Sequence, residues 1–61
     1  MKQKTLNNAN KLFALYQINT FIKDNKIFVN LGDIELQISN EEIEERAKQY
    51  KAYKNLINKN T

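Results

Sequence analysis

The clearest pattern in this chain of 61 residues is the alternation of apolar and polar positions between residues 18 and 38. Three short runs alternate with a period of two, which is typical of β-strands with one buried face. Two-residue breaks that contain Asp, Asn and Gly separate the runs, and such breaks favour tight hairpins. The pattern therefore predicts a three-stranded antiparallel meander with one aliphatic face. Its strands are expected at residues 18–23, 26–31 and 34–38.

Each two-residue turn also sets the register of the strands that it joins. With Asp24-Asn25 as the first turn, Phe21 lies opposite Phe28 and Lys23 lies opposite Lys26. With Gly32-Asp33 as the second, Phe28 also lies opposite Gln37. The aromatic pair therefore lies on the more polar face of the sheet, close to two lysines. Phe21, Phe28, Lys23 and Lys26 are the first candidate binding residues.

Helical spacing marks the two ends of the chain. A first helix is expected over residues 6–16, with Thr5 as its N-cap and an apolar stripe that begins at Leu6. A second helix is expected over residues 40–58. Ser39 and Glu42 have the spacing of a capping box, and the four glutamates near this end complement the helix dipole. Its inward stripe is predicted to consist of Ile43, Ala47, Tyr50 and Ile57.

These elements predict a single α+β domain, residues 1–61, of order α-β-β-β-α. The stripe of the last helix is expected to cover the aliphatic face of the meander. A second and smaller apolar contact is expected from Tyr16, Tyr53 and Leu56, which makes Tyr53 and Leu56 the second choice of partner-binding residues.

Composition then limits the chemistry. The sequence has no His and no Cys, the usual general base, nucleophilic thiol and metal ligands, and its single Gly excludes Gly-rich phosphate loops. The only cluster of carboxylates lies in the first turns of the last helix, where dipole complementation and capping explain it. We therefore expect no enzymatic activity, no cofactor and no metal site.

Charge leaves nucleic acid open as a partner. The net charge of +3 is modest, but an antiparallel sheet can stack bases on aromatic rings and bind phosphates with lysines. Phe21, Phe28, Lys23 and Lys26 fit this description, and the strand and helix order is similar in topology to sheet-type DNA-binding domains. Glu35 on the same face and the lack of Arg there weigh against it. Nucleic-acid binding is thus the alternative function.

Protein association is the leading hypothesis. A chain of this size has a thin core, and an open pair of Phe rings would be an apolar patch of the kind that marks interfaces. A partner protein, a second copy of the chain, or both are expected at this face. The basic amphipathic end of the last helix could instead lie on an anionic membrane or on RNA, although the glutamates at its start argue for an ordinary solvated face. Its basic residues are Arg46, Lys48, Lys51, Lys54 and Lys59.

These observations together predict a small, non-enzymatic binding or regulatory module of the cytoplasm. No run approaches the roughly 18 apolar residues of a membrane span. Frequent Asn, Lys and Ile suggest AT-rich coding, as in low-GC bacteria and their phages. The order helix, three strands, helix is similar in architecture to phage-encoded inhibitors of host defence nucleases, which implies an accessory or inhibitor protein of a phage or mobile element.

Overall fold

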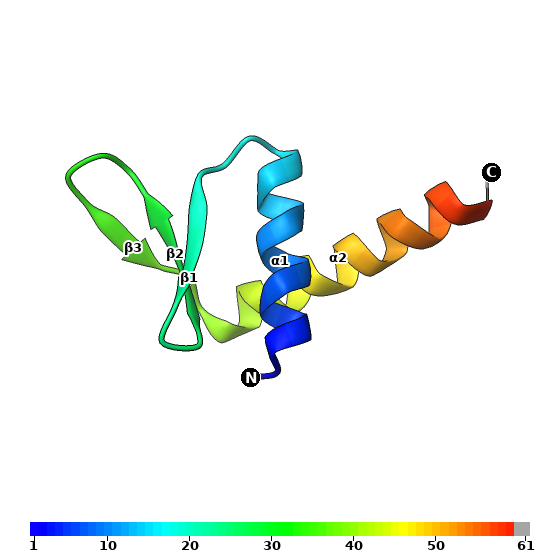
Figure 1. Ribbon diagram of the computed structural model, residues 1–61, viewed down its shortest axis with the longest axis horizontal. Coiled ribbons are helices and arrows are strands. Elements are labelled where there is room, and N and C mark those ends of the chain that lie inside the picture. Colours follow the sequence, from blue (N-terminus) through cyan, green and yellow to red (C-terminus); the bar gives the residue numbers. More distant parts are fainter. Residues whose placement is uncertain (60–61) are drawn as a thin grey trace.

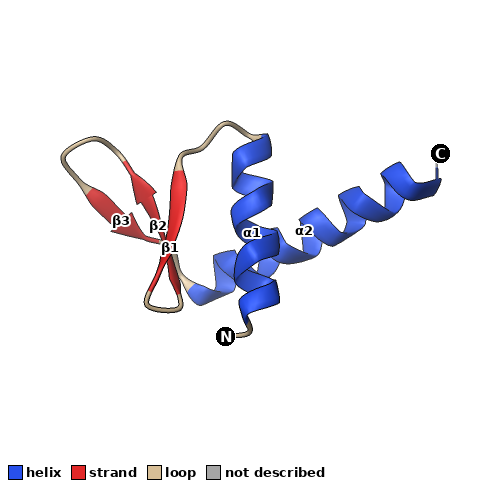
Figure 2. Ribbon diagram, viewed as in Figure 1, coloured by secondary structure: helices blue, strands red, loops and turns tan. Residues whose placement is uncertain are grey.

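The computed structural model describes residues 1–59 and has the order helix, three strands, helix (Figures 1 and 2). This confirms the predicted α+β class and the antiparallel meander, in which β2 is the central strand. The elements are α1 (Gln3–Leu15), β1 (Thr20–Lys23), β2 (Lys26–Asn30), β3 (Glu35–Gln37) and α2 (Asn40–Lys59).

The predicted strand register is also confirmed. Phe21 pairs with Phe28, Lys23 with Lys26, and Phe28 with Gln37 on the other side of β2. In the first turn both central residues have positive φ, 53° at Asp24 and 61° at Asn25, as a type I′ hairpin requires. In the second turn Gly32 has a φ of +88°, a conformation that glycine adopts without strain.

The end of α1 explains why β1 begins at Thr20 rather than at residue 18. Gln17 adopts a φ of 61°, and its N–H donates to the carbonyl of Ala14 while the N–H of Ile18 donates to the carbonyl of Phe13. This pair of bonds is a Schellman motif, which satisfies the last carbonyls of the helix. Residues 16–18 are therefore used to end the helix and cannot extend the strand.

The helix starts differ from the expectation in detail. The helix α1 begins at Gln3, and its N-cap is Lys2 without a side-chain cap, so Thr5 lies inside the first turns. At α2 the hydroxyl of Ser39 accepts from the N–H of Glu42 at 3.2 Å, which is one half of the predicted capping box. The carboxylate of Glu42 instead accepts from Nε of Arg46 at 2.8 Å.

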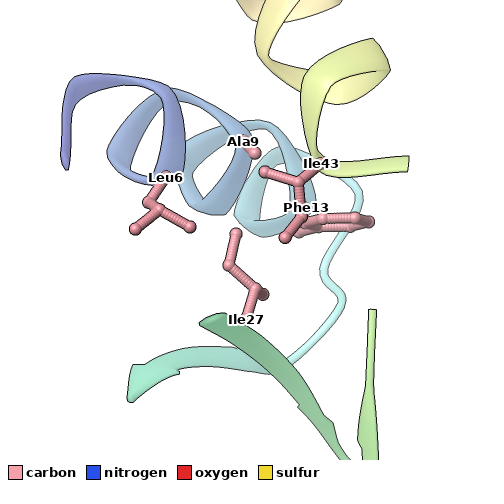
Figure 3. Packing of buried hydrophobic residues seen from close by; sticks show 5 residues of the cluster. All are labelled: Leu6, Ala9, Phe13, Ile27 and Ile43. Carbon is pink, nitrogen blue, oxygen red and sulfur yellow. The ribbon is translucent and has the colours of Figure 1, made fainter. Parts of the chain in front are cut away.

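The core is small and lies where three elements meet. Its members come from α1, β2 and the first turns of α2, and Figure 3 shows them pointing toward one another. Ile22, Ile38 and Ala47 pack against this cluster. The meander and α2 thus share one core, and α1 contributes the largest part of it. The buried cluster consists of Leu6, Ala9, Phe13, Ile27 and Ile43.

Only the first half of α2 is held by this core. Ile43 is fully buried and Ala47 packs on the cluster, but Ile57 at the end of the predicted inward stripe is 43% exposed. Figure 1 shows the reason, because α1 crosses the first half of α2 and the rest of α2 extends away from the body. The radius of gyration, 12.1 Å, exceeds the roughly 10.5 Å of a compact domain of this length.

Candidate interaction surfaces

Most of the exposed large apolar side chains fall into two groups. One group lies at the β2–β3 hairpin and comprises Leu31, Ile34 and Leu36, each more than half exposed. The other spans the two helices and comprises Leu15, Tyr16, Tyr53, Leu56 and Ile57. Scattered apolar side chains on a surface need no explanation, but contiguous groups mark interaction sites.

The Phe21–Phe28 pair of the first candidate site lies on the sheet face opposite the core. Its ring centroids are 5.5 Å apart and the rings are stacked, with an interplanar angle of 20°. Both side chains are half-buried, and Lys23 and Lys26 beside them are exposed. Since Ile27 points to the core and side chains alternate along a strand, α1 covers the other face and not this pair.

This geometry makes the pair a weaker binding platform than its sequence position indicates. Each ring uses one of its faces on the other ring, so the surface left for a base or an apolar side chain is reduced. The stacking of a cross-strand pair stabilises the sheet by about 0.5–1.5 kcal/mol. A structural role thus accounts for the arrangement of Phe21 and Phe28.

The second candidate site lies beside a groove between the two helices, which we call the apolar groove. One wall is the C-terminal half of α1 and the other is the middle of α2. Tyr16 and Tyr53 lie on opposite walls, and Leu56, 62% exposed, lies one turn farther along α2. The groove is lined by Leu12, Leu15, Tyr16, Gln49, Ala52 and Tyr53.

Arg46 lies at the edge of the apolar groove and contacts residues of both helices. Its guanidinium carbon lies 5.6 Å from the ring centre of Phe13 and 5.8 Å from that of Tyr16. The guanidinium also donates to Glu42 and, through Nη1 at 3.2 Å, to the side-chain oxygen of Gln49. Cation–π contacts of this kind are worth about 0.5–1 kcal/mol at exposed sites. The arginine thereby ties Tyr16, a mostly exposed ring, to α2.

A second groove, the basic groove, lies on the other side of the crossing, between the N-terminal end of α1 and the same part of α2. Five lysines line it against one carboxylate, Glu44. Its lysines are Lys2, Lys4, Lys48, Lys51 and Lys54. The rest of its lining is Met1, Thr5, Asn8, Ala47, Tyr50, Asn55 and Asn58.

The sequence marked the lysines of α2 as a candidate RNA or membrane face, but it did not predict the groove that they form with Lys2 and Lys4. Lys2 and Lys4 are more than forty positions away from Lys48, and only the crossing of α1 over α2 brings the two sets together. Taken alone, each set is indistinguishable from an ordinary solvated face. A partial signal exists, because lysines and asparagines recur at spacings of three and four along one side of α2, at residues 48, 51, 55 and 58.

Within residues 1–59, no group of three or more acidic side chains is placed to hold a metal ion. The described helices also include none that is long and apolar enough to cross a membrane.

The chain has no significant match among protein-family models, curated proteins or solved structures.

Proposed function

We propose that this chain is a small non-enzymatic binding module that acts through protein–protein contact, and that its first partner is a second copy of itself. The observation that carries the proposal is the free half of α2. That half extends past α1 and exposes Tyr53, Leu56 and Ile57 beside the apolar groove. Within residues 1–59 the rest of the chain leaves these three side chains 41–62% exposed.

The accessible surface area of the chain supports association with a second copy. A compact monomer of 7.2 kDa exposes roughly 4100 Å², whereas this chain exposes 4741 Å². The excess of about 600 Å² approaches the roughly 800 Å² that each partner loses in a standard interface. A dimer that covers the free half of α2 would therefore leave each copy with about the exposed area of a compact monomer of the same mass.

The apolar groove and its neighbouring side chains are also self-complementary. Leu56 lies about five residues after the middle of the α2 wall, which corresponds to about 7.5 Å along the helix axis. If two α2 helices run antiparallel about an axis near Tyr53, each Leu56 enters the apolar groove of the other copy. A two-fold interface repeats the contact, and the basic end of each α2 runs toward the acidic end of its partner.

The size of the chain and its AT-rich coding support the further proposal of an accessory or inhibitor protein of a phage or mobile element, acting in the cytoplasm. A dimer built through α2 would leave the β2–β3 hairpin and the Phe21–Phe28 face free for a larger target. This assignment of class rests on sequence character and architecture.

The test is the mass in solution of the wild-type chain and of two matched variants. Light scattering should give about twice 7.2 kDa for the wild type, and Leu56→Glu should shift it to the monomer. Leu36→Glu is the control, since Leu36 is 54% exposed and belongs to the hairpin group. It should leave the dimer intact, and circular dichroism should show both variants folded.

Two results would contradict the proposal. A wild-type chain that stays monomeric at the highest attainable concentration has no self-association to explain. A dimer that Leu36→Glu dissociates and Leu56→Glu does not would place the interface on the hairpin instead.

A further inference from the structure

We infer that the basic groove binds the phosphate backbone of a nucleic acid. The groove has a strong local charge. Five lysines and one glutamate give the lining of the groove four net positive charges, which exceeds the +3 of the whole chain. The remaining surface is therefore slightly acidic, and the groove is the basic side of the molecule.

The lysines of the basic groove form no ion pairs within residues 1–59. All five of them are exposed. Lys54 alone has a charge-specific contact, with its Nζ 5.9 Å from the ring centre of Tyr50. Their charge is available to a partner.

The arrangement of these lysines fits a linear polyanion. Lys48, Lys51 and Lys54 follow one another at about 4.5 Å along the axis of α2, and Lys2 and Lys4 lie on the opposite wall. A nucleic-acid strand in a duplex carries one negative charge per roughly 3.4 Å of rise. A narrow strand can therefore contact lysines of both walls at once, whereas a flat bilayer would meet only the rims of the groove.

The remaining lining adds hydrogen-bond donors that a phosphate backbone can use. Thr5, Asn8 and Asn55 offer side-chain N–H and O–H donors to the same space, and phosphate oxygens accept such bonds. The contacts are to the backbone, so we expect binding with little dependence on base sequence.

This inference is independent of the proposed dimer. The basic groove and the apolar groove lie on opposite flanks of α2, so a second copy on one flank leaves the other open. Leu56→Glu should accordingly keep its affinity for nucleic acid within about threefold, apart from any avidity that a dimer adds.

The experiment measures fluorescence anisotropy with labelled oligothymidylate and with a duplex of mixed sequence. Affinity of the wild type should fall roughly 100- to 500-fold between about 50 and about 200 mM salt, as five phosphate contacts imply. The groove variant replaces Lys48, Lys51 and Lys54 by Gln. It should lose more than about tenfold in affinity, and its slope of log affinity against log salt should flatten by about two to three.

The control variant replaces Lys11, Lys23 and Lys26 by Gln, which removes the same charge outside the groove. It should stay within about threefold of the wild type. A second groove variant, Lys2→Gln with Lys4→Gln, tests the opposite wall and should also lose affinity. Circular dichroism should show that each variant keeps the helical content of the wild type.

Several outcomes would overturn the inference. One is a wild-type chain that binds neither probe at low salt. Another is a control variant that loses as much as the groove variant, which would point to net charge or to the sheet face with Lys23 and Lys26. A third is equally tight binding of polyglutamate or of phosphatidylserine vesicles, which would make the groove a general anion or membrane surface.

Discussion

The apolar groove and the basic groove flank the same crossing of two helices, yet their chemistry is opposite. Both use α1 as one wall and the middle of α2 as the other. On one flank α2 supplies Gln49, Ala52 and Tyr53, and on the other it supplies Lys48, Lys51 and Asn55. The two sets occupy neighbouring positions in sequence, and only the helical period separates them into different surfaces.

The difference shows how a helix with a narrow inward stripe can serve two partners. Ile43 and Ala47 anchor α2 to the core, so both flanks of its second half remain available. α1 makes the two flanks of α2 different. Its apolar C-terminal residues contact one flank, and its lysine-bearing N-terminal end lies beside the other. A protein contact and a polyanion contact can therefore coexist on one short helix.

The largest effect is expected from removing the support that both grooves share. Ile43 is fully buried beneath the crossing, and Ile43→Ala should lower the free energy of unfolding by about 2–5 kcal/mol. Because that is much of the stability of a small domain, dimerisation and oligonucleotide binding should be lost together. Urea unfolding followed by circular dichroism measures the loss.

Ile57→Ala is the matched control, since Ile57 lies on the same stripe but is 43% exposed. It should change the stability of the monomer by less than about 1 kcal/mol. An Ile43→Ala protein as stable as Ile57→Ala would mean that α2 is not anchored at this point.

Features of the fold that depend on residues close together in sequence could be predicted, and features that depend on distant residues could not. The meander and its register follow from period-two alternation and two-residue turns, and every pairing derived from them is confirmed. These are local signals, since each turn joins residues only a few positions apart. The half-formed capping box of Ser39 belongs to the same class.

The grooves could not be predicted because they depend on how α1 crosses α2. The sequence shows that Tyr50 and Ile57 share a stripe, but not that α1 covers only the first part of it. For the same reason Tyr53 and Leu56 were second to the Phe pair among the candidate residues, and Lys2 and Lys4 were not candidates at all. Whether Phe21 and Phe28 serve as a binding site remains a prediction that mutation can test.

A smaller effect separates the sheet face from both grooves. Phe28→Ala should lower the free energy of unfolding by about 1–2 kcal/mol, because it removes a half-buried ring and its stacking on Phe21. Mass by light scattering and oligonucleotide affinity should be unchanged under conditions where the variant is folded. Phe28→Leu, which keeps apolar bulk without the ring, should recover part of the stability.

If Phe28→Ala instead abolished dimerisation or binding while the protein remained folded, the first candidate site would be the functional one. The two helical grooves would then not be the main binding surfaces. The stacked pair would bind a partner in addition to stabilising the sheet.

The smallest expected effect distinguishes the grooves from each other. Arg46 contacts the rings of Phe13 and Tyr16 on the apolar side, and Arg46→Gln should cost about 0.5–1 kcal/mol of stability. Tyr16 would no longer be held against α2, so the dimer dissociation constant should rise a few-fold. Lys11→Gln removes the same charge away from either groove and is the control. Because Arg46 does not line the basic groove, both variants should bind oligothymidylate alike, and an Arg46→Gln protein that lost nucleic acid and kept its dimer would reverse the assignment of the two flanks.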